Sequence, residues 1–435
     1  MDRRGFLKLG LITFGAALLP EHQLLRRPPN LILIMADDLG YECLGCDGGS
    51  SYSTPNLDRM AREGVHFTRC YATPLCTPSR VEIMTGKYNF RNYTEFGCLR
   101  PGEKKFAHLL KQAGYRTCVV GKWQLAGRTP YTRYHARGTR PENAGFDEHC
   151  LWLVDKIGSR YWDPTITRNG ELIERIPDRY GPDIFAEYAV DFIRRNRGRP
   201  FFLYYPMALT HAPFVPTPDS PDWRQFKHAN DPRYFPDMVA YMDKIVGRIL
   251  AVLRELRLER NTLVLFTGDN GTDRRIRSRI DGRTVQGRKG ETVDAGTHVP
   301  LIGWWPGKVP AGRVCGDLVD FTDFLPTLLD AAGTSVPRDF VLDGRSFFPQ
   351  LMGRKGNPRE WIFCYYDPRW GRWKKSVFIQ TRRWKLYEDG RVFDLAADPG
   401  EERPVQVENL PRDAKRRVEQ LRATLQQMLA GAKRP

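Results

Sequence analysis

The sequence predicts an α/β protein in which a doubly wound mixed sheet is flanked by helices, followed by a smaller antiparallel sheet and one helix. Two continuous apolar runs, at residues 31–35 and 262–267, are each followed by acidic residues and glycine. Such runs are typical of strands buried on both faces of a sheet that helices cover. Segments with apolar residues at spacings of three and four lie between the expected strands, and this alternation favours the α/β class.

The expected elements follow from these patterns in chain order. Strands are expected at 31–35, 117–120, 201–205 and 262–267, and helices at 56–63, 105–113, 183–195 and 236–256. From about residue 361 the sequence predicts short aromatic-rich strands, at 376–380 and 384–387. A last helix places Val418, Leu421, Leu425 and Met428 on one stripe. We therefore expect a main α/β domain at 29–358 and a C-terminal subdomain at 359–435.

Residues 1–28 read as an export signal. Arg3 and Arg4 precede a Gly-Phe-Leu-Lys string, and an apolar stretch follows at 9–19 that is too short to span a bilayer. The string resembles a twin-arginine signal, which implies the twin-arginine export machinery and a periplasmic or extracellular location. An ordinary secretion signal is the alternative. Because no clear cleavage site follows, a membrane tether formed by the uncleaved signal also stays open.

The charge balance predicts anionic partners. The chain carries 68 Lys and Arg against 51 Asp and Glu, a formal net charge of +17. The basic residues are scattered, without the tract or finger spacing of a nucleic-acid reader, so no nucleic-acid partner is expected. Cys43 and Cys46 form a C-x-x-C without a second pair at zinc spacing. A local disulfide or two thiols is therefore expected there in preference to zinc.

Polar side chains follow the two buried strands where each strand ends. Asp37 and Asp38 follow the first strand, and Asp269 and Asn270 follow the strand at 262–267. Ligands of open α/β sheets bind outside the carboxyl ends of strands. Four oxygen side chains suit Ca²⁺ or Mg²⁺ better than zinc or copper. Each dipeptide is also a common turn sequence, which is the alternative interpretation.

The string Cys-Thr-Pro-Ser-Arg at 76–80 resembles the Cys-x-Pro-Ser-Arg signature of type I sulfatases. Other segments resemble the same family over about residues 30–405: 54–58, 84–86, 121–123, 211–213, 289–290 and 323–327. The resemblance implies the alkaline-phosphatase-like fold. It also implies that Cys76 is oxidised to formylglycine by a formylglycine-generating enzyme, and that the hydrate supplies the nucleophilic hydroxyl.

The resemblance implies one Ca²⁺ per chain, with Mg²⁺ less favoured. The implied metal ligands are Asp37, Asp38, Cys76, Asp269 and Asn270. The implied catalytic residues are Cys76, Arg80, Lys122, Gln124, His211 and Lys289.

A sulfuryl transfer needs fixed cations around the negative charge of its transition state. By resemblance, Arg80 stabilises the hydrate, and Lys122 and Lys289 hold sulfate oxygens. His211 is the expected proton donor to the leaving oxygen, together with Lys289. Asp269 is the candidate acceptor for the proton of the nucleophile.

Two positions depart from the family pattern. Gln124 stands where the family has a histidine that helps to release sulfate, and glutamine does not exchange protons near neutral pH. We expect slower sulfate release or a substitute group. The alternative is a catalytically impaired glycan-binding homologue. The second departure lies at 294–298, where His298 is expected to be mainly structural.

The sequence thus predicts hydrolysis of sulfate esters on a sulfated saccharide or an aryl sulfate. A phosphoester or phosphonate hydrolase on the same scaffold is the alternative, because phosphate and sulfate are similar tetrahedral anions. Phosphate monoesters tend to recruit further cations or a second metal, and the sequence offers ligands for one metal. Loops at 128–143 and 219–233 are expected to shape the substrate pocket.

Overall fold

A computed structural model describes residues 27–127 and 137–432 of the protein. Nearly all of the export signal predicted at 1–28 lies outside the described residues, as do residues 128–136 of one predicted pocket loop. Within the described part of the chain, no helix combines the length and hydrophobicity needed to cross a bilayer.

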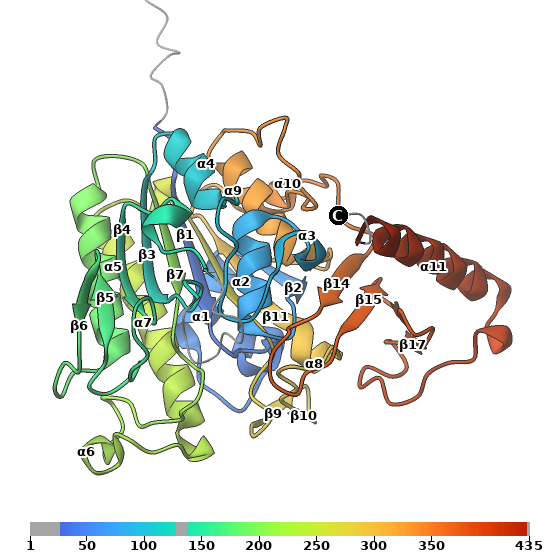
Figure 1. Ribbon diagram of the computed structural model, residues 1–435, viewed down its shortest axis with the longest axis horizontal. Helices are drawn as coiled ribbons and strands as arrows, with labels where there is room; N and C mark the ends of the chain where they lie inside the picture. Colours follow the sequence, from blue (N-terminus) through green and yellow to red (C-terminus); the bar gives the residue numbers. More distant parts are fainter. Residues whose placement is uncertain (1–26, 128–136, 433–435) are drawn as a thin grey trace, which may run out of the picture.

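An eleven-stranded mixed sheet forms the centre of the protein (Figure 1). Its path runs through β12 (Arg313–Cys315), β2 (Val65–Tyr71), β11 (His298–Trp304), β8 (Thr262–Gly268), β1 (Asn30–Ala36), β7 (Phe201–Pro206), β3 (Arg116–Lys122), β4 (Glu148–Trp152), β5 (Ile166–Arg168) and β6 (Glu171–Ile173), with β13 (Val319–Asp320) paired to β2. The strands from β8 to β4 along this path are parallel, and β11 is antiparallel to both of its neighbours. The four predicted strands, β1, β3, β7 and β8, are adjacent at the centre of the sheet, and the predicted fold class is confirmed.

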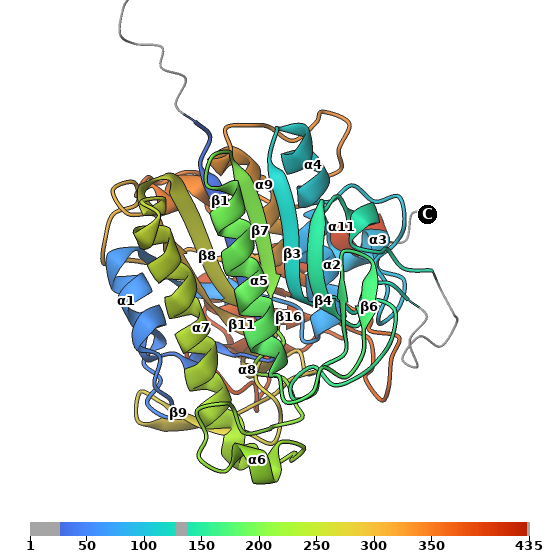
Figure 2. The ribbon, with the colours of Figure 1, turned by 90° about the vertical axis from the view of Figure 1, so that its left-hand side faces the viewer.

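Helices cover both faces of this sheet because the buried strands present apolar side chains to both sides. Along β1, Ile32 and Ile34 belong to one apolar cluster and Leu31 and Leu33 to the other. The first face is covered by α1 (Pro55–Glu63), α5 (Gly181–Asn196) and α7 (Phe235–Glu255), as Figure 2 shows. The second face is covered by α2 (Cys76–Thr85), α4 (Phe106–Gln112) and α9 (Phe324–Ala331).

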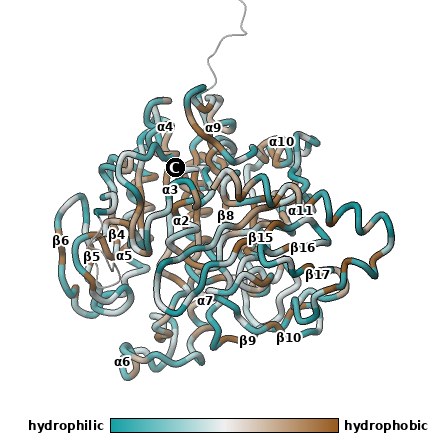
Figure 3. Tube along the Cα trace, turned by 45° about the vertical axis from the view of Figure 1, so that its right-hand side comes forward, coloured by the Kyte–Doolittle hydropathy of each residue, from teal (hydrophilic) through white to brown (hydrophobic). Residues whose placement is uncertain are grey.

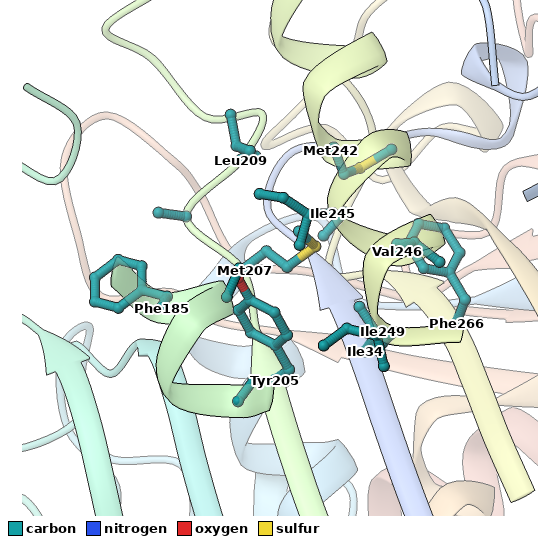
Figure 4. Packing of buried hydrophobic residues seen from close by; sticks show 14 of the residues in the cluster. Ile34, Phe185, Tyr205, Met207, Leu209, Met242, Ile245, Val246, Ile249 and Phe266 are labelled. Carbon is teal, nitrogen blue, oxygen red and sulfur yellow. The ribbon is translucent and has the colours of Figure 1, made fainter. Parts of the chain in front are cut away.

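The helix interface on the first face is densely apolar. Figure 4 shows Met242, Ile245 and Ile249 of α7 on the side of the sheet to which Ile34 and Phe266 point, with Ile249 beside Ile34. The four helices predicted in this domain are present, with ends shifted by one or two residues. Helix α2 was not predicted, because all ten of its residues are buried and it has no amphipathic period.

The C-terminal part is a small antiparallel sheet with one long helix. The sheet consists of β14 (Ile362–Tyr366), β15 (Ser376–Gln380), β16 (Trp384–Tyr387) and β17 (Val392–Asp394). Helix α11 (Arg412–Ala432) buries Val418, Leu421 and Leu425 in a cluster with residues of this sheet, and Met428 is partly buried there. This agrees with the predicted stripe, and Figure 3 shows apolar segments along α11 among hydrophilic ones.

The remaining α-helices and strands are short and lie in the connections. They are α3 (Asn89–Asn92), α6 (Trp223–Phe226), α8 (Asp294–Thr297), α10 (Phe348–Leu351), and the hairpin of β9 (Arg277–Ile280) and β10 (Arg283–Gln286). The predicted loop at 219–233 contains α6.

Arg359 joins the two sheets through a buried ion pair. Its Nε donates to Oδ2 of Asp323 at 2.7 Å, and its other nitrogens donate to the Thr322 hydroxyl, the Tyr88 hydroxyl and the Asp343 carbonyl. Arg359 precedes β14, whereas Asp323 lies directly before α9, which packs on the main sheet. Removing one partner of a buried pair leaves the other charge without compensation.

We therefore predict that Arg359→Met lowers the free energy of unfolding by about 3–5 kcal/mol. Urea unfolding followed by circular dichroism measures this loss. The matched control is Arg354→Met at an exposed position five residues earlier, which should leave stability nearly unchanged. Equal midpoints for the two variants would contradict the role given to Arg359.

Candidate functional site

The candidate site begins where β1 and β8 end side by side. The two strands are parallel and in register, so that Ala36 lies opposite Gly268 and the next residues, Asp37 and Asp269, leave the sheet at the same level. The backbone N–H of Asp38 donates to Oδ1 of Asp269 at 3.0 Å. The side chains at these strand ends are fully buried: Asp37, Asp38, Asp269 and Asn270. Regular parallel pairing thus concentrates three carboxyl groups at one edge of the sheet.

Cys76 lies beside these carboxyl groups. It is the first residue of α2 and is buried, and its Sγ and one carboxylate oxygen each of Asp37 and Asp269 lie within 4.8 Å of one another. Ser79, the serine of the Cys-x-Pro-Ser-Arg string, connects α2 to the segment before it. Its hydroxyl lies 2.7 Å from the Thr73 hydroxyl and donates to the Thr73 carbonyl. The predicted convergence of position 76 with the strand-end acids is therefore present.

Three predicted cationic residues form ion pairs with the carboxylates, and Arg80 contacts both Asp269 and Asp37. Arg80 Nη2 lies 2.9 Å from Asp269 Oδ2, and Lys122 Nζ lies 2.7 Å from Asp37 Oδ2. Lys289 Nζ lies 2.6 Å from Asp38 Oδ2. These cations come from α2, the end of β3 and the loop after β10, so three separate chain segments enclose the carboxyl groups.

His211 and Gln124 lie on loops that follow neighbouring strands. His211 Nδ1 donates to the Ala212 carbonyl at 2.5 Å, which leaves Nε2 facing Asp38 Oδ2 at 3.7 Å. Gln124 is buried two residues after Lys122, and its backbone N–H donates to the Leu153 carbonyl at 3.1 Å. All predicted site residues thus lie at the carboxyl ends of the central strands or on α2 and the loop that holds Lys289.

The electrostatics of the carboxyl groups follow from burial and from their neighbours. Burial alone would raise the pKa of Asp37, but the positive charges around it, led by Lys122, hold the pKa well below its usual value. Burial raises the pKa of Asp38, and burial with the adjacent negative charge of Asp37 raises the pKa of Asp269 to about 7. Without a further cation the three carboxyl groups do not all ionise to the same extent, because each negative charge disfavours ionisation of its buried neighbours.

Two oxygen atoms at the site accept no hydrogen bond. Asp37 Oδ1 and Asn270 Oδ1 are both buried and without a hydrogen-bond partner, although the Asn270 amide donates to Asp38 Oδ1 at 2.9 Å. Buried acceptors are rarely left unsatisfied. Oxygen atoms from three carboxylates and one amide are the donor set of a hard divalent cation such as Ca²⁺. The residues therefore fit the metal that the sequence implied.

Arg160 is a site residue that the sequence did not predict. Its Nη1 lies 3.6 Å from Asp37 Oδ2, its side chain is 11% exposed, and its guanidinium lies over the Trp152 ring at 3.8 Å. This Nη1 is buried and donates no hydrogen bond to a described residue. Arg160 follows β4 in a connection without a motif, so no spacing signal distinguishes it from other arginines.

The small sheet also approaches the site. Cys76 belongs to an apolar cluster with Ile362 and Tyr366 of β14, against which Trp370 and Trp373 pack. His298, the first residue of β11, is stacked on the rings of Tyr41 and Tyr71, with ring centroids 3.9 and 4.8 Å apart. These contacts agree with the structural part expected for His298.

Buried carboxylates enclosed by fixed cations, beside a potential nucleophile at the strand ends of a doubly wound sheet, define a hydrolase of anionic esters. Comparison with known proteins gives the family. Residues 29–334 match the sulfatase family, and residues 291–433 match the family described as N-sulphoglucosamine sulphohydrolase, C-terminal. The chain therefore belongs to the sulfatase family, in its type I branch of the alkaline-phosphatase-like superfamily, and is a sulfuric ester hydrolase.

Individual relatives cover nearly the whole chain. N-acetylgalactosamine-6-sulfatase of Canis lupus familiaris is 31% identical over 92% of this chain and 85% of its own length. The crystal structure of Ps i-CgsB in complex with k-i-k-neocarrahexaose is 25% identical, with a TM-score of 0.75 over 94% of this chain and 93% of that chain. Phosphonate monoester hydrolase of Agrobacterium radiobacter shares the fold at 20% identity, with a TM-score of 0.70 over 92% of this chain and 96% of its own.

We predict that Arg160→Ala raises the KM for a sulfate ester by about tenfold, because a charge-assisted contact to a bound anion contributes about 1.5–3 kcal/mol. The kcat should change less. Initial rates over a range of substrate concentrations separate the two constants. Arg168→Ala, at an exposed position on β5, is the control and should match the unaltered protein. A KM unchanged in Arg160→Ala would exclude a contact between this side chain and the substrate.

Proposed function

We propose that the protein hydrolyses sulfate esters of a carbohydrate or an aryl alcohol, using a calcium-bound formylglycine derived from Cys76. The observation that carries this proposal is the position of Cys76. Its Sγ lies within 4.8 Å of carboxylate oxygens of Asp37 and Asp269, and these acids are paired with Lys122 and Arg80. A nucleophile, metal ligands and anion-binding cations thus meet at one place.

Calcium is supported by the donor atoms. Asp37, Asp38, Asp269 and Asn270 offer only oxygen, and the free oxygens of Asp37 and Asn270 have no hydrogen-bond partner. When bound, Ca²⁺ supplies charge that polarises a sulfate oxygen and lowers the repulsion among the carboxylates. The resemblance to type I sulfatases supports Ca²⁺ over Mg²⁺.

Modification of Cys76 is supported by the chemistry of the unmodified residue. Burial raises the pKa of the Cys76 thiol, so the unmodified side chain stays protonated and is a weak nucleophile. A formylglycine hydrate supplies a hydroxyl nucleophile at this position. Its formation is an oxidation of the thiol side chain to an aldehyde, which requires a formylglycine-generating enzyme and an external oxidant.

The other residues bind the anion and move protons. Lys122, Lys289 and Arg160 face the site with positive charge and are placed to bind sulfate oxygens. Arg80, on the same helix as Cys76 and paired with Asp269, is the residue proposed to stabilise the hydrate. Burial and the charge of Lys289 keep the pKa of His211 well below its usual value in the free site. The negative charge of a bound ester favours protonation, which suits His211 to give a proton to the leaving oxygen.

A saccharide substrate is supported by the relatives and by the aromatic residues near the site. N-acetylgalactosamine-6-sulfatase is named for a sugar sulfate, and Ps i-CgsB was crystallised with an oligosaccharide. Trp370 and Trp373 pack against the cluster that contains Cys76, and aromatic rings are common contacts for sugar faces. The net charge of +17 favours an anionic glycan.

We further propose that the chain is exported by the twin-arginine machinery to the periplasm or cell exterior, with or without a retained membrane tether. The main domain is proposed to span 29–358 and the C-terminal subdomain 359–435. The position of Arg359 between the two sheets supports this boundary.

Two alternatives concern the reaction. Phosphonate or phosphoester hydrolysis is favoured only by the shared fold of phosphonate monoester hydrolase. Impaired catalysis is favoured by Gln124, which lies two residues after Lys122 and does not exchange protons.

The proposal predicts that protein coexpressed with a formylglycine-generating enzyme carries an aldehyde at position 76. Mass spectrometry of the peptide containing residues 76–80 should show the mass of formylglycine instead of cysteine. The same protein should release sulfate from sulfated saccharides or aryl sulfates, and Cys76→Ala should reduce release to background. An aryl phosphonate serves as the parallel substrate. A protein that carries only the thiol, or that prefers the phosphonate, would contradict the proposal.

Because Gln124 does not exchange protons, we predict that sulfate release is a slow step after the leaving group departs. Rapid mixing with an aryl sulfate should give a burst of the phenol, followed by slower steady turnover. Gln124→His should raise the steady rate by at least about tenfold through acid–base catalysis, without changing the burst amplitude. Gln124→Asn is the control, because asparagine does not titrate and should give no gain. Fast turnover without a burst in the unaltered protein would show that Gln124 does not limit release.

A further inference from the structure

A second group of metal-ligating side chains lies away from the proposed catalytic residues, on the connection after β1. Cys46 and Asp47 belong to the short 3₁₀ turn Gly45–Asp47, and His66 is the second residue of β2. His66 lies opposite Ile302 of β11, on the far side of that strand from β8. The C-x-x-C pair, Cys43 and Cys46, forms no disulfide, since both residues are free thiols.

The three ligand atoms are close enough for one ion. Cys46 Sγ, a carboxylate oxygen of Asp47 and a ring nitrogen of His66 all lie within 4.8 Å of one another, and His66 Nε2 lies 2.7 Å from Asp47 Oδ1. Zinc bonds to sulfur, nitrogen and oxygen at about 2.0–2.3 Å, which places tetrahedral ligands roughly 3–4 Å apart. The side chains therefore need only small movements to surround a cation.

One carboxylate oxygen of Asp47 in this cluster has no hydrogen-bond partner. The Asp47 side chain is 5% exposed, and its Oδ2 is buried without a hydrogen-bond partner. Such an atom is unusual in a folded protein unless water or an ion completes it. A pocket of about 310 Å³ lies beside Cys46 and His66, and Asp58, Arg62 and Arg313 are among its other lining residues. It leaves room for a water molecule as a fourth ligand.

Neighbouring residues hold the cluster in place. Asp58 on α1 accepts a hydrogen bond from the Cys46 backbone N–H at 2.8 Å, and Thr54 accepts one from the Gly45 N–H at 3.0 Å. The ligands thus come from a braced turn and from a strand of the central sheet. Burial and the negative charges of Asp47 and Asp58 raise the pKa of the Cys46 thiol, so the free site holds the protonated thiol. A bound cation favours the thiolate, because metal ligation requires loss of the thiol proton.

We propose that Cys46, Asp47 and His66 bind one divalent cation of the zinc class, with a water molecule as the fourth ligand. A ligand set of sulfur, nitrogen and oxygen suits zinc. It differs from the all-oxygen set at the strand ends, which suits hard cations such as Ca²⁺. Binding releases the thiol proton of Cys46 to solvent, and the ring nitrogen of His66 that binds the ion carries no proton. No group is oxidised or reduced. The bound ion ties the turn after β1 to β2 and stabilises that part of the fold.

Cobalt titration tests the site, because a thiolate bound to Co²⁺ gives a charge-transfer absorption in the near ultraviolet. The parent protein is Cys76→Ser, saturated with Ca²⁺, so that no thiol remains at the strand-end site. We expect the band to saturate at one Co²⁺ per chain and to disappear when Zn²⁺ is added. Adding Cys46→Ser should remove the band, whereas the matched change Cys43→Ser should keep it.

A second pair of variants guards against misfolding. Asp47→Asn, which preserves shape, and His66→Ala should each weaken cobalt binding by at least about tenfold while the circular dichroism spectrum stays unchanged. Zn²⁺ should raise the melting temperature of the parent protein but not that of the Cys46→Ser variant. Absence of the band in the parent, or its persistence after Cys46→Ser, would overturn the proposal. Because this readout requires no sulfate release, it is independent of the proposed reaction.

Discussion

The site depends on the burial of three carboxyl groups side by side. Parallel pairing in register brings Asp37 and Asp269 to the same level, and Asp38 follows directly. Burying like charges is costly unless opposite charges or a metal compensate. The protein supplies Arg80, Lys122, Lys289 and Arg160 from four different segments, and these cations also make the site attractive to a tetrahedral anion. One electrostatic requirement therefore accounts for both the assembly of the site and the class of substrate.

The sequence predicted the centre of the sheet well because its strands carry strong local signals. The runs of β1 and β8 are buried on both faces, and the acidic residues that follow them indicate the position of the site. Helix α2 was missed, since uniform burial removes the amphipathic period. Arg160 was missed for a different reason: its contribution comes from the path of a long connection, which no local pattern encodes.

The roles of the predicted residues rested on the sulfatase signature, and geometry alone would have left them open. Lysines are usually solvated surface groups, and histidines are buried to an intermediate degree. Lys122 and Lys289 are instead turned inward by the carboxylates, and the His211 backbone is held by Tyr161, whose hydroxyl donates to its carbonyl. The small sheet adds aromatic side chains near Cys76, so the C-terminal part of the chain contributes to the surroundings of the site as well as to stability.

The central claim is that one divalent cation belongs among the strand-end oxygens next to position 76. Calorimetric titration of metal-depleted protein with Ca²⁺ tests it most directly, using Asn270→Leu and Asp269→Ala as variants that remove single ligands. The account predicts one Ca²⁺ bound per chain by the unaltered protein, and at least about tenfold weaker binding by each variant. Failure to bind Ca²⁺, or equal affinity in all three proteins, would contradict it.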